Sequence, residues 1–322
     1  MEANKTRKLR WAVVGLGKIA QAAVLPAFEH ATENAKLVAL VSSDHEKLHT
    51  LGAKYAAEAT GMYDELERII EDAAVDAVYL AVPSSLHREM TERAARAGAN
   101  VLCEKPMAAT SEDCEAMIEA CDDAGVKLMI AYRLHFEAAR SDTGEPRIFT
   151  SVFTHPVREG DMRGALVDMG IHCINAARHV FEAEPLSVVA MQTVGTEERL
   201  RHVDEMTSVV MRFPDDRIAQ FIVSHGAPVV SRLHVIGTKG DVELVSRMDP
   251  FAPEIVRFSR CIIDGSTPEP SGQEGLADVR VIEAIVRSAA TREVVHVEAA
   301  ERTSRQSRPY EPRKPPVGQW TT

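Results

Sequence analysis

Residues 11–20 of the chain read WAVVGLGKIA, and this stretch decides how the first half of the sequence folds. An apolar run, Trp11–Val14, ends at Gly15, and a helix-compatible stretch, Ile19–His30, follows after a short glycine-rich segment. The change from a short apolar run to a helical pattern predicts a strand, a tight turn and a helix.

The turn itself has the pattern GxGxxA, formed by Gly15, Gly17 and Ala20. Positions without bulky side chains let backbone N–H groups approach a pyrophosphate at the N-terminus of a helix. An ordinary glycine-rich turn is the alternative interpretation. The position of the pattern in the first strand–helix unit favours dinucleotide binding.

Strand and helix patterns alternate as far as residue 132. Four further apolar runs are separated by amphipathic segments: runs 37–41, 77–82, 101–103 and 128–132, and segments 64–72, 88–97 and 112–124. Thr110 and Asp113 have the spacing of a helix cap before the last segment. This alternation predicts an α/β fold, with a doubly wound parallel sheet of the Rossmann type over residues 1–132.

The pattern changes in the second half of the chain. Short β-rich runs separated by turn residues occur at 187–194, 207–213, 218–224, 233–236 and 242–245, and a helical pattern covers 276–290. We therefore predict a second, α+β domain over residues 133–322, with an open, mostly antiparallel sheet and a helix packed near it. The proline-containing tail 308–322 is expected to be extended.

The composition excludes several classes of protein. The chain has 322 residues, of which 45% are hydrophobic and 26% charged, as in ordinary globular proteins. A net charge of -11 disfavours nucleic acid as a partner, and no apolar run approaches the length of a membrane span. Five cysteines without a CxxC pair indicate reduced thiols, and no HxxxH or HExxH spacing points to a metal site. We expect a cytoplasmic enzyme.

The residues after the second predicted strand bear on cofactor choice. NAD enzymes commonly place an acid there to bind the ribose hydroxyls, whereas this chain has Ser42. Ser42 and Lys47 suit a 2′-phosphate and favour NADP, while Asp44, two residues later, keeps NAD open. The alternative is that Ser42 caps the next helix and Lys47 is a solvated surface charge.

Two further motifs carry residues suited to proton transfer. Glu104 and Lys105 end a predicted buried strand, at the edge where open α/β sheets bind ligands, although a surface ion pair is the alternative. Asp168, His172 and Asn175 have spacings that place them on one helix face. Histidine is the commonest general acid/base. The alternative is that Asp168 caps the helix and His172 is a histidine of the core.

The other histidines give weaker signals. His87 follows a predicted strand and is expected to lie on the nicotinamide side, and His135 lies where the chain crosses between domains. We interpret His179, His225 and His234 as structural.

Taken together, the motifs resemble the Gfo/Idh/MocA family of pyridine-nucleotide oxidoreductases, and most closely its glucose–fructose oxidoreductase-like branch. The resemblance spans nearly the whole chain. It is carried by VVGLGKIA at 13–20, ALVSSDHEK at 39–47, DAVYLAVPSSLH at 76–87, VLCEKPMA at 101–108, KLMIAYRLH at 127–135, LVDMGIHCIN at 166–175 and GLADVRVIEAI at 275–285.

The resemblance implies roles for individual residues. Lys105 would act at the substrate hydroxyl, the Lys105-Pro106 bond is expected to be cis, and His172 would be the acid/base residue with Asp168 as its partner. Glucose–fructose oxidoreductases have tyrosine where this chain has His172, so the histidine resembles the wider family. The candidate cofactor-binding residues are Gly15, Gly17, Lys18, Ile19, Ala20, Ser42, Lys47, Pro83, His87, Glu104 and Arg133.

The sequence therefore predicts an NADP(H)-dependent oxidoreductase that moves a hydride between nicotinamide and a hydroxyl or carbonyl carbon of a sugar or related polyol. NAD is the alternative cofactor. The resemblance also implies a homodimer or homotetramer formed through the C-terminal sheet. A cyclitol or dihydrodiol dehydrogenase, and a non-catalytic dinucleotide-sensing regulator, are the alternative functions.

Overall fold

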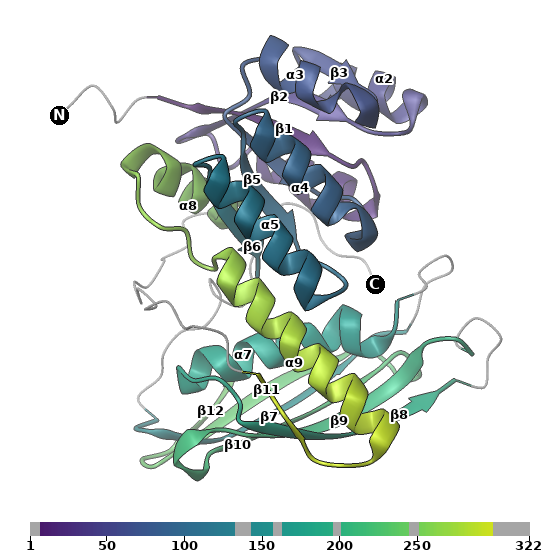
Figure 1. Cartoon of the computed structure of the whole chain (residues 1–322), viewed down its shortest axis with the longest axis vertical. Helices are drawn as coiled ribbons and strands as arrows, with labels where there is room; N and C mark the ends of the chain where they lie inside the picture. Colours follow the sequence, from purple (N-terminus) through teal and green to yellow (C-terminus); the bar gives the residue numbers. More distant parts are fainter. Residues whose placement is uncertain (1–6, 133–142, 157–162, 196–200, 245–250, 299–322) are drawn as a thin grey trace. The chain divides into compact units, whose positions relative to one another are not determined.

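The computed structural model describes residues 7–132, 143–156, 163–195, 201–244 and 251–298 (Figure 1). The described residues form two compact units, one from 7–132 with 251–275 and the other from 143–244 with 276–298. Residues 251–275 thus pack with the first unit although they follow most of the second in sequence. The predicted division after residue 132 does not include this return of the chain.

The first unit contains a six-stranded sheet in which every strand pairs in parallel. The strand order is β3-β2-β1-β4-β5-β6, and the strands are β1 (Leu9–Val14), β2 (Ala35–Val41), β3 (Ala59–Gly61), β4 (Ala77–Leu80), β5 (Asn100–Glu104) and β6 (Leu128–Ala131). The prediction of a doubly wound sheet is confirmed. The order reverses between β1 and β4, the point where such sheets bind ligands at the carboxyl ends of their strands.

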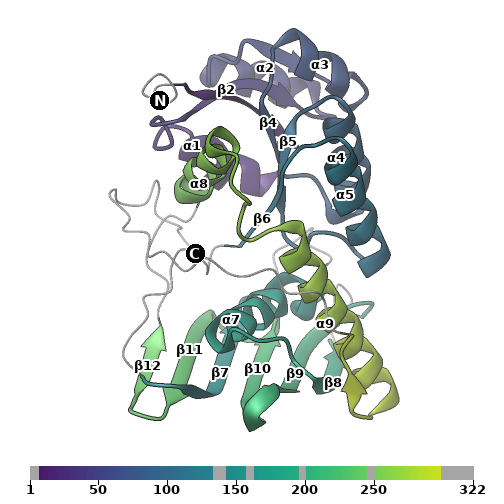
Figure 2. The same cartoon turned by 60° about the vertical axis from the view of Figure 1, so that its left-hand side comes forward.

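Helices cover both faces of this sheet (Figure 2). They comprise a π-helical turn (Ala20–Val24), α1 (Leu25–Ala27), α2 (His45–Lys54), a 3-10 turn (Tyr63–Glu65), α3 (Leu66–Asp72), a 3-10 turn (Ser84–Leu86), α4 (His87–Arg96), α5 (Ser111–Asp123) and α8 (Phe251–Asp264). The Thr110 hydroxyl accepts a hydrogen bond from the Asp113 amide, which confirms the predicted cap of α5.

Helix α8 joins the first unit through its apolar face. The buried Trp11 ring of β1 packs edge-on against Phe28 at 5.8 Å and against Phe258 of α8 at 5.9 Å, and its Nε1 donates to Ser259 Oγ at 3.1 Å. Each such aromatic pair contributes about 0.5–1.5 kcal/mol beyond the area it buries. Sequence reasoning missed α8, although Phe251, Ile255 and Phe258 have the i, i+4, i+7 spacing of a helix face.

The helix after the glycine turn is shorter than predicted. It was expected to reach His30, but α1 ends at Ala27 and residues 28–30 form a turn. The Phe28, Glu29 and His30 amides donate to carbonyls three residues earlier, at 3.3, 3.0 and 3.0 Å. Hydrogen bonds between residues three apart wind the backbone more tightly than an α-helix does, and the α-helix therefore ends here.

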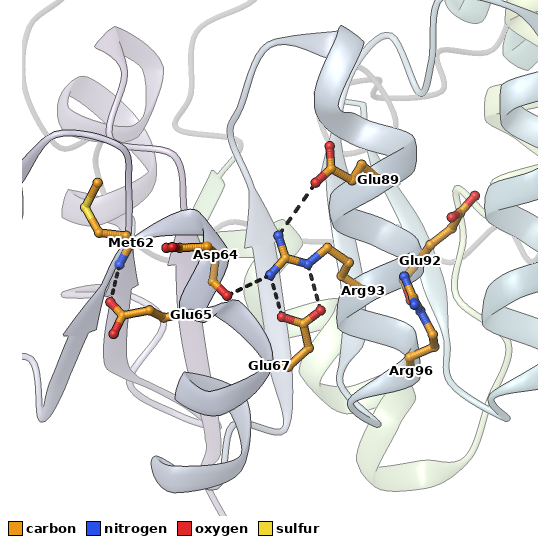
Figure 3. A network of polar contacts seen from close by, with 8 residues as sticks. All are labelled: Met62, Asp64, Glu65, Glu67, Glu89, Glu92, Arg93 and Arg96. Atoms are coloured by element: carbon orange, nitrogen blue, oxygen red, sulfur yellow. Dashed lines mark hydrogen bonds and ion pairs between the residues drawn. The ribbon is translucent and has the colours of Figure 1, made fainter.

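A polar network joins α3 to α4 on the surface of the first unit (Figure 3). The Arg93 guanidinium of α4 donates to both carboxylate oxygens of Glu67 and, at 3.3 Å, to the Asp64 carbonyl, and it lies 3.6 Å from Glu89. Such a two-pronged arrangement fixes the geometry more firmly than a single ion pair does. It therefore holds neighbouring helices of the same layer in register.

The second unit contains a seven-stranded sheet of order β12-β11-β7-β10-β9-β8-β13. Its strands are β7 (Pro146–Thr154), β8 (Ser187–Val194), β9 (Asp204–Arg212), β10 (Ile218–Ser224), β11 (Val230–Gly237), β12 (Asp241–Leu244) and β13 (Val295–His296). Only β7 and β10 pair in parallel among these strands, so the prediction of a mostly antiparallel sheet is confirmed.

Strand β7 was missed because its residues do not alternate cleanly between apolar and polar. Ser151 faces inward on the same side as the buried Phe149, and its hydroxyl donates to the Arg232 carbonyl at 3.0 Å, whereas Ile148 and Val152 lie on the other face and are exposed. A hydrogen-bonded hydroxyl can be buried, but it interrupts the apolar pattern of an inward strand face.

Helices cover one face of this second sheet (Figures 1 and 2). They are a π-helical turn (Leu166–Gly170), α7 (Ile171–Phe181) and most of α9 (Gly272–Thr291), which confirms the helix predicted at 276–290. A buried network joins them: Arg178 donates to Asp278 at 2.6 Å and to Glu184, and Asn175 donates to Asp278 at 2.7 Å.

The opposite face of the second sheet exposes apolar side chains. They come from four adjacent strands and comprise Ile148, Val152, Val189, Met191, Met206, Val210, Ile218 and Ile222. We call this set the outer sheet face. In the described part of the chain, no helix has the length and apolarity needed to cross a membrane.

Candidate active site

The glycine turn lies at the carboxyl end of β1, beside the ends of β2 and β4. Gly15 donates to the Val41 carbonyl at 2.8 Å, and Ala81 donates to the Val14 carbonyl at 2.8 Å. After the turn the chain enters a helix at once, and Gln21 donates back to the Gly17 carbonyl at 3.1 Å. This is the strand–turn–helix context that the GxGxxA pattern requires.

The two glycines of the turn do different things. Gly15 has a φ of 95°, and a methyl group there would lie 2.6 Å from the Ala81 carbonyl oxygen. Gly17 is exposed, and nothing lies within 4 Å of a methyl group built on it. Gly15 is therefore required by the fold, whereas Gly17 leaves an open cradle that fits a pyrophosphate against the backbone.

The remaining residues of the motif divide between core and surface. Ala20 is fully buried, Ile19 is half-buried, and Lys18 is exposed next to Gly17. Pro83, at the end of the β4 loop, is exposed as well. Arg133 falls outside the described residues, so its predicted cofactor contact stays a prediction.

The end of β2 differs in detail from the sequence-based interpretation. Asp44, and not Ser42, is the cap of α2, because its carboxylate accepts from the Lys47 amide at 3.0 Å. This amide, followed by the Lys47 side chain, lowers the pKa of Asp44. Ser42 is buried and its hydroxyl accepts from the Asp44 amide at 3.2 Å, while the ammonium of Lys47 lies 3.0 Å from Asp44.

Sequence reasoning missed a neighbour of this group, Tyr63. Its hydroxyl is hydrogen-bonded to Ser43, and Lys47 acts on it electrostatically. Burial raises the pKa of Tyr63, with these two neighbours opposing the shift. Tyr63 follows β3, the strand next to β2, so only the sheet order could have revealed the contact.

Glu104 and Lys105 lie at the same edge of the sheet as the glycine turn, since both motifs follow carboxyl ends of parallel strands. The Lys105-Pro106 peptide bond is cis, as the resemblance implied. Glu104 accepts from the Tyr79 hydroxyl at 2.9 Å and from the Lys105 amide at 3.2 Å. Lys105 is half-buried.

His87 is buried against backbone carbonyls. Its Nδ1 lies 3.0 Å from the Pro106 oxygen and 3.1 Å from the Met107 oxygen, and its Nε2 lies 3.0 Å from the Val82 oxygen. Burial lowers the pKa of His87, although the carbonyls oppose the shift. His87 therefore ties the loop after β4 to the segment that follows Lys105.

In the second unit, Asp168 lies on the π-helical turn and His172 on α7. Asp168 lies 3.2 Å from the Arg163 guanidinium, and the buried His172 ring lies 6.0 Å from the Phe153 ring. Asn175 instead donates to Asp278, so it belongs to the buried network of this unit. The partnership of Asp168 with His172 stays a prediction.

Asp204 anchors the start of the helix that carries these residues, and sequence reasoning missed it. One oxygen of its carboxylate accepts from the Leu166 amide at 2.7 Å and from the Thr207 hydroxyl at 2.8 Å. A carboxylate at the first turn satisfies an amide that has no partner within the helix. Its separation from residue 166 in sequence leaves no local signal.

Comparison with known proteins identifies the family. Residues 9–132 match a model described as oxidoreductase family, NAD-binding Rossmann fold, GFO_IDH_MocA, and residues 136–243 match the GFO/IDH/MocA C-terminal domain. The chain belongs to the GFO/IDH/MocA family. The resemblance seen in the sequence motifs is therefore confirmed, and the protein is an NAD(P)-dependent oxidoreductase.

Three relatives illustrate the range of this family. A crystal structure of an aldose-aldose oxidoreductase from Caulobacter crescentus is 35% identical, with a TM-score of 0.85 over 90% of this chain and 100% of that one. A D-xylose 1-dehydrogenase [NADP(+)] from Haloarcula marismortui is 28% identical over 90% of this chain and 93% of its own. An inositol 2-dehydrogenase from Rhizobium meliloti is 25% identical over 90% and 99%.

The contrast between the two glycines of the GFO/IDH/MocA turn gives a direct test. Gly17→Val should leave the melting temperature close to that of the wild type, because its side chain enters open space, but should weaken NAD(P) binding about 100-fold or more by filling the cradle. Gly15→Ala should lower the melting temperature, because its methyl group meets the Ala81 carbonyl. Calorimetry and fluorescence titration measure the two effects. Unchanged cofactor affinity in Gly17→Val contradicts the assignment.

Proposed function

We propose that the protein is an NADP(H)-dependent dehydrogenase whose substrate is a sugar, and that Lys105 and His172 handle the proton of the reacting hydroxyl. The observation that carries the proposal is the placement of Lys105 at the same sheet edge as the Gly17 cradle. A proton-transferring side chain beside a dinucleotide site is what hydride transfer at a hydroxyl carbon requires.

The names of the relatives support an aldose as the substrate. The relative with 35% identity is called an aldose-aldose oxidoreductase, and the Haloarcula marismortui relative a D-xylose dehydrogenase. A cyclitol is the second candidate, because the Rhizobium meliloti relative is an inositol dehydrogenase. The aldose is preferred because the structure with the higher identity carries that name.

The chain's own residues would divide the chemistry. The cofactor, when bound, supplies a hydride acceptor or donor at its nicotinamide. The backbone at Gly17 and the exposed Lys18 would hold the pyrophosphate, and Lys105 would hydrogen-bond the substrate hydroxyl. His172 would take up the hydroxyl proton during oxidation, with Asp168 stabilising the charged ring.

Turnover with a panel of aldoses, alditols and cyclitols tests this function. The wild type should reduce NADP with at least one aldose. Lys105→Ala and His172→Ala should each lower kcat about 10²–10⁴-fold, as expected for loss of a positioned acid/base group, with little change in cofactor affinity.

Two surface variants serve as controls for these losses. Lys54→Ala removes an exposed lysine that lies over the Tyr55 ring, and His234→Ala removes a half-buried histidine paired with Asp241. Both should turn over like the wild type. Tight NADP binding without turnover on any member of the panel would favour the dinucleotide-sensing regulator instead, and normal kcat in His172→Ala would make His172 a structural residue.

The preference for NADP over NAD is the next part of the proposal. It is supported by the group formed by Ser43, Lys47 and Tyr63, which offers two hydroxyls and a cation at the end of β2. Asp44, the acid that would favour NAD, has its carboxylate engaged as the cap of α2. A 2′-phosphate is bound well by hydroxyls and a cation, whereas a free carboxylate would repel it.

Lys47→Ala tests the cofactor preference. Because hydrogen bonds to charged groups are worth about 1.5–3 kcal/mol, the variant should lower kcat/KM for NADP about tenfold or more while leaving kcat/KM for NAD nearly unchanged. Lys36→Ala, an exposed lysine paired with Glu58, is the matched control. A wild type that already prefers NAD would show that the group at β2 does not recognise a 2′-phosphate.

We further propose that the protein forms a homo-oligomer through the outer sheet face. Eight exposed apolar side chains on four adjacent strands support this, because monomers rarely expose a large continuous apolar patch. Ile222→Glu and Val210→Glu should convert the oligomer to a monomer in light scattering after size exclusion. Val286→Glu, at an exposed apolar position on α9, should not. A monomeric wild type would refute this part.

The cytoplasm is the proposed location. All five cysteines are buried, and none of them forms a disulfide. Free thiols are typical of proteins in a reducing compartment.

A further inference from the structure

Tyr79 is a buried phenol that the function proposed above does not use. It lies on β4, its side chain is fully buried, and its hydroxyl donates to Glu104 Oε1 at 2.9 Å. Burial, followed by the neighbouring carboxylates of Glu104 and Glu254, raises the pKa of Tyr79 well above its ordinary value. The hydroxyl is therefore protonated and acts as a hydrogen-bond donor.

Glu104 connects this hydroxyl to Lys105. Glu104 is the last residue of β5, the strand beside β4, and its other oxygen, Oε2, accepts from the Lys105 amide at 3.2 Å. A carboxylate held at one oxygen by a rigid, buried donor cannot rotate freely about its last bond. The Tyr79 hydroxyl thus fixes the oxygen that binds the Lys105 backbone.

The chain after Lys105 is held from the other side. The His87 ring contacts the carbonyl oxygens of Pro106 and Met107, the two residues that follow Lys105. Lys105 therefore lies between two anchors, one before it at Glu104 and one after it at His87. Loss of either anchor frees the backbone from which the lysine side chain extends.

A second carboxylate, that of Glu254, also acts on the Tyr79 hydroxyl. The Glu254 side chain is fully buried on α8, the helix with which the chain returns to this unit after β12, and it acts electrostatically on Tyr79. Two carboxylates next to one phenol disfavour its ionised form. The donor character of Tyr79 is thereby maintained across the pH range in which dehydrogenases work.

We propose that Tyr79 is a positioning residue for Lys105, acting through Glu104. This inference rests on the proposed role of Lys105 in proton handling. Misplacement of a reacting group by about 1 Å can cost about 10²-fold in rate, so a hydrogen bond that orients the lysine backbone has a measurable effect on turnover.

Tyr79→Phe removes only the hydroxyl oxygen and keeps the ring that fills the core. We expect kcat with the substrate found in the panel to fall about ten- to a hundredfold, with NADP affinity and KM changing much less. Hydride transfer should become more rate-limiting, so the deuterium isotope effect on kcat should rise. Tyr55→Phe, which removes a hydroxyl from a half-buried tyrosine elsewhere in the unit, should leave both quantities unchanged.

A double-mutant cycle with Glu104→Gln tests whether Tyr79 acts through Glu104. If it does, the double variant should be no slower than Glu104→Gln alone. Fully additive losses, or a normal kcat in Tyr79→Phe, would overturn the inference. If Tyr79→Phe does not fold, Glu104→Gln must reproduce the fall in kcat and the raised isotope effect, and failure to do so would also overturn it.

The Lys105→Ala variant separates this inference from the function on which it rests. Normal turnover in Lys105→Ala would refute the proposed role of the lysine itself. A strong loss in Lys105→Ala together with normal turnover in Tyr79→Phe would refute only the positioning role of Tyr79.

Discussion

The first unit depends on the close approach of the Gly15 backbone to the chain that leaves β4. A methyl group at Gly15 would lie 2.6 Å from the Ala81 carbonyl oxygen, so only glycine lets β1 and β4 end side by side. The strand order reverses at these two strands, and doubly wound sheets bind their ligands at such a reversal. The cradle at Gly17 and the loop that reaches His87 both begin at this contact.

From this contact, hydrogen bonds made by side chains extend the ordered edge to Lys105. The β4 loop leads to His87, and His87 contacts the carbonyls of Pro106 and Met107 after Lys105. On the other side, Tyr79 and Glu104 hold the Lys105 amide. Both anchors are buried or half-buried and depend on strands that are neighbours in the sheet. A rigid edge of this kind suits a group that must be placed within a fraction of an ångström.

Much of this arrangement could be predicted from the sequence, because its signals are local. The GxGxxA turn, the alternating runs up to residue 132 and the Thr110 cap each lie within a few consecutive residues. Helix α8 and strand β7 were missed for different reasons. The spacing of Phe251, Ile255 and Phe258 was present but unused, whereas the inward Ser151 and the exposed Ile148 and Val152 obscure the strand pattern of β7.

The candidate site residues that were missed depend on contacts between distant parts of the chain. Tyr63 is placed beside Lys47 by the pairing of β2 with β3, and Asp204 reaches the Leu166 amide of the π-helical turn from strand β9. The alternative interpretation, in which Ser42 caps the next helix, is wrong, because Asp44 is the cap of α2. No local pattern reveals the contacts of Tyr63 and Asp204, because packing between distant segments decides them, whereas the Asp44 cap is a local contact with the Lys47 amide.

The central claim, that this chain catalyses hydride transfer between a sugar hydroxyl carbon and NADP, is tested most directly by isotope transfer. The protein is incubated with NADP and an aldose deuterated at C1, and the reduced cofactor is examined by NMR. The account predicts deuterium at C4 of the nicotinamide, on one face only, together with oxidation of the sugar at C1. Reduced cofactor without deuterium, or no reduced cofactor with any aldose although NADP binds, would contradict it.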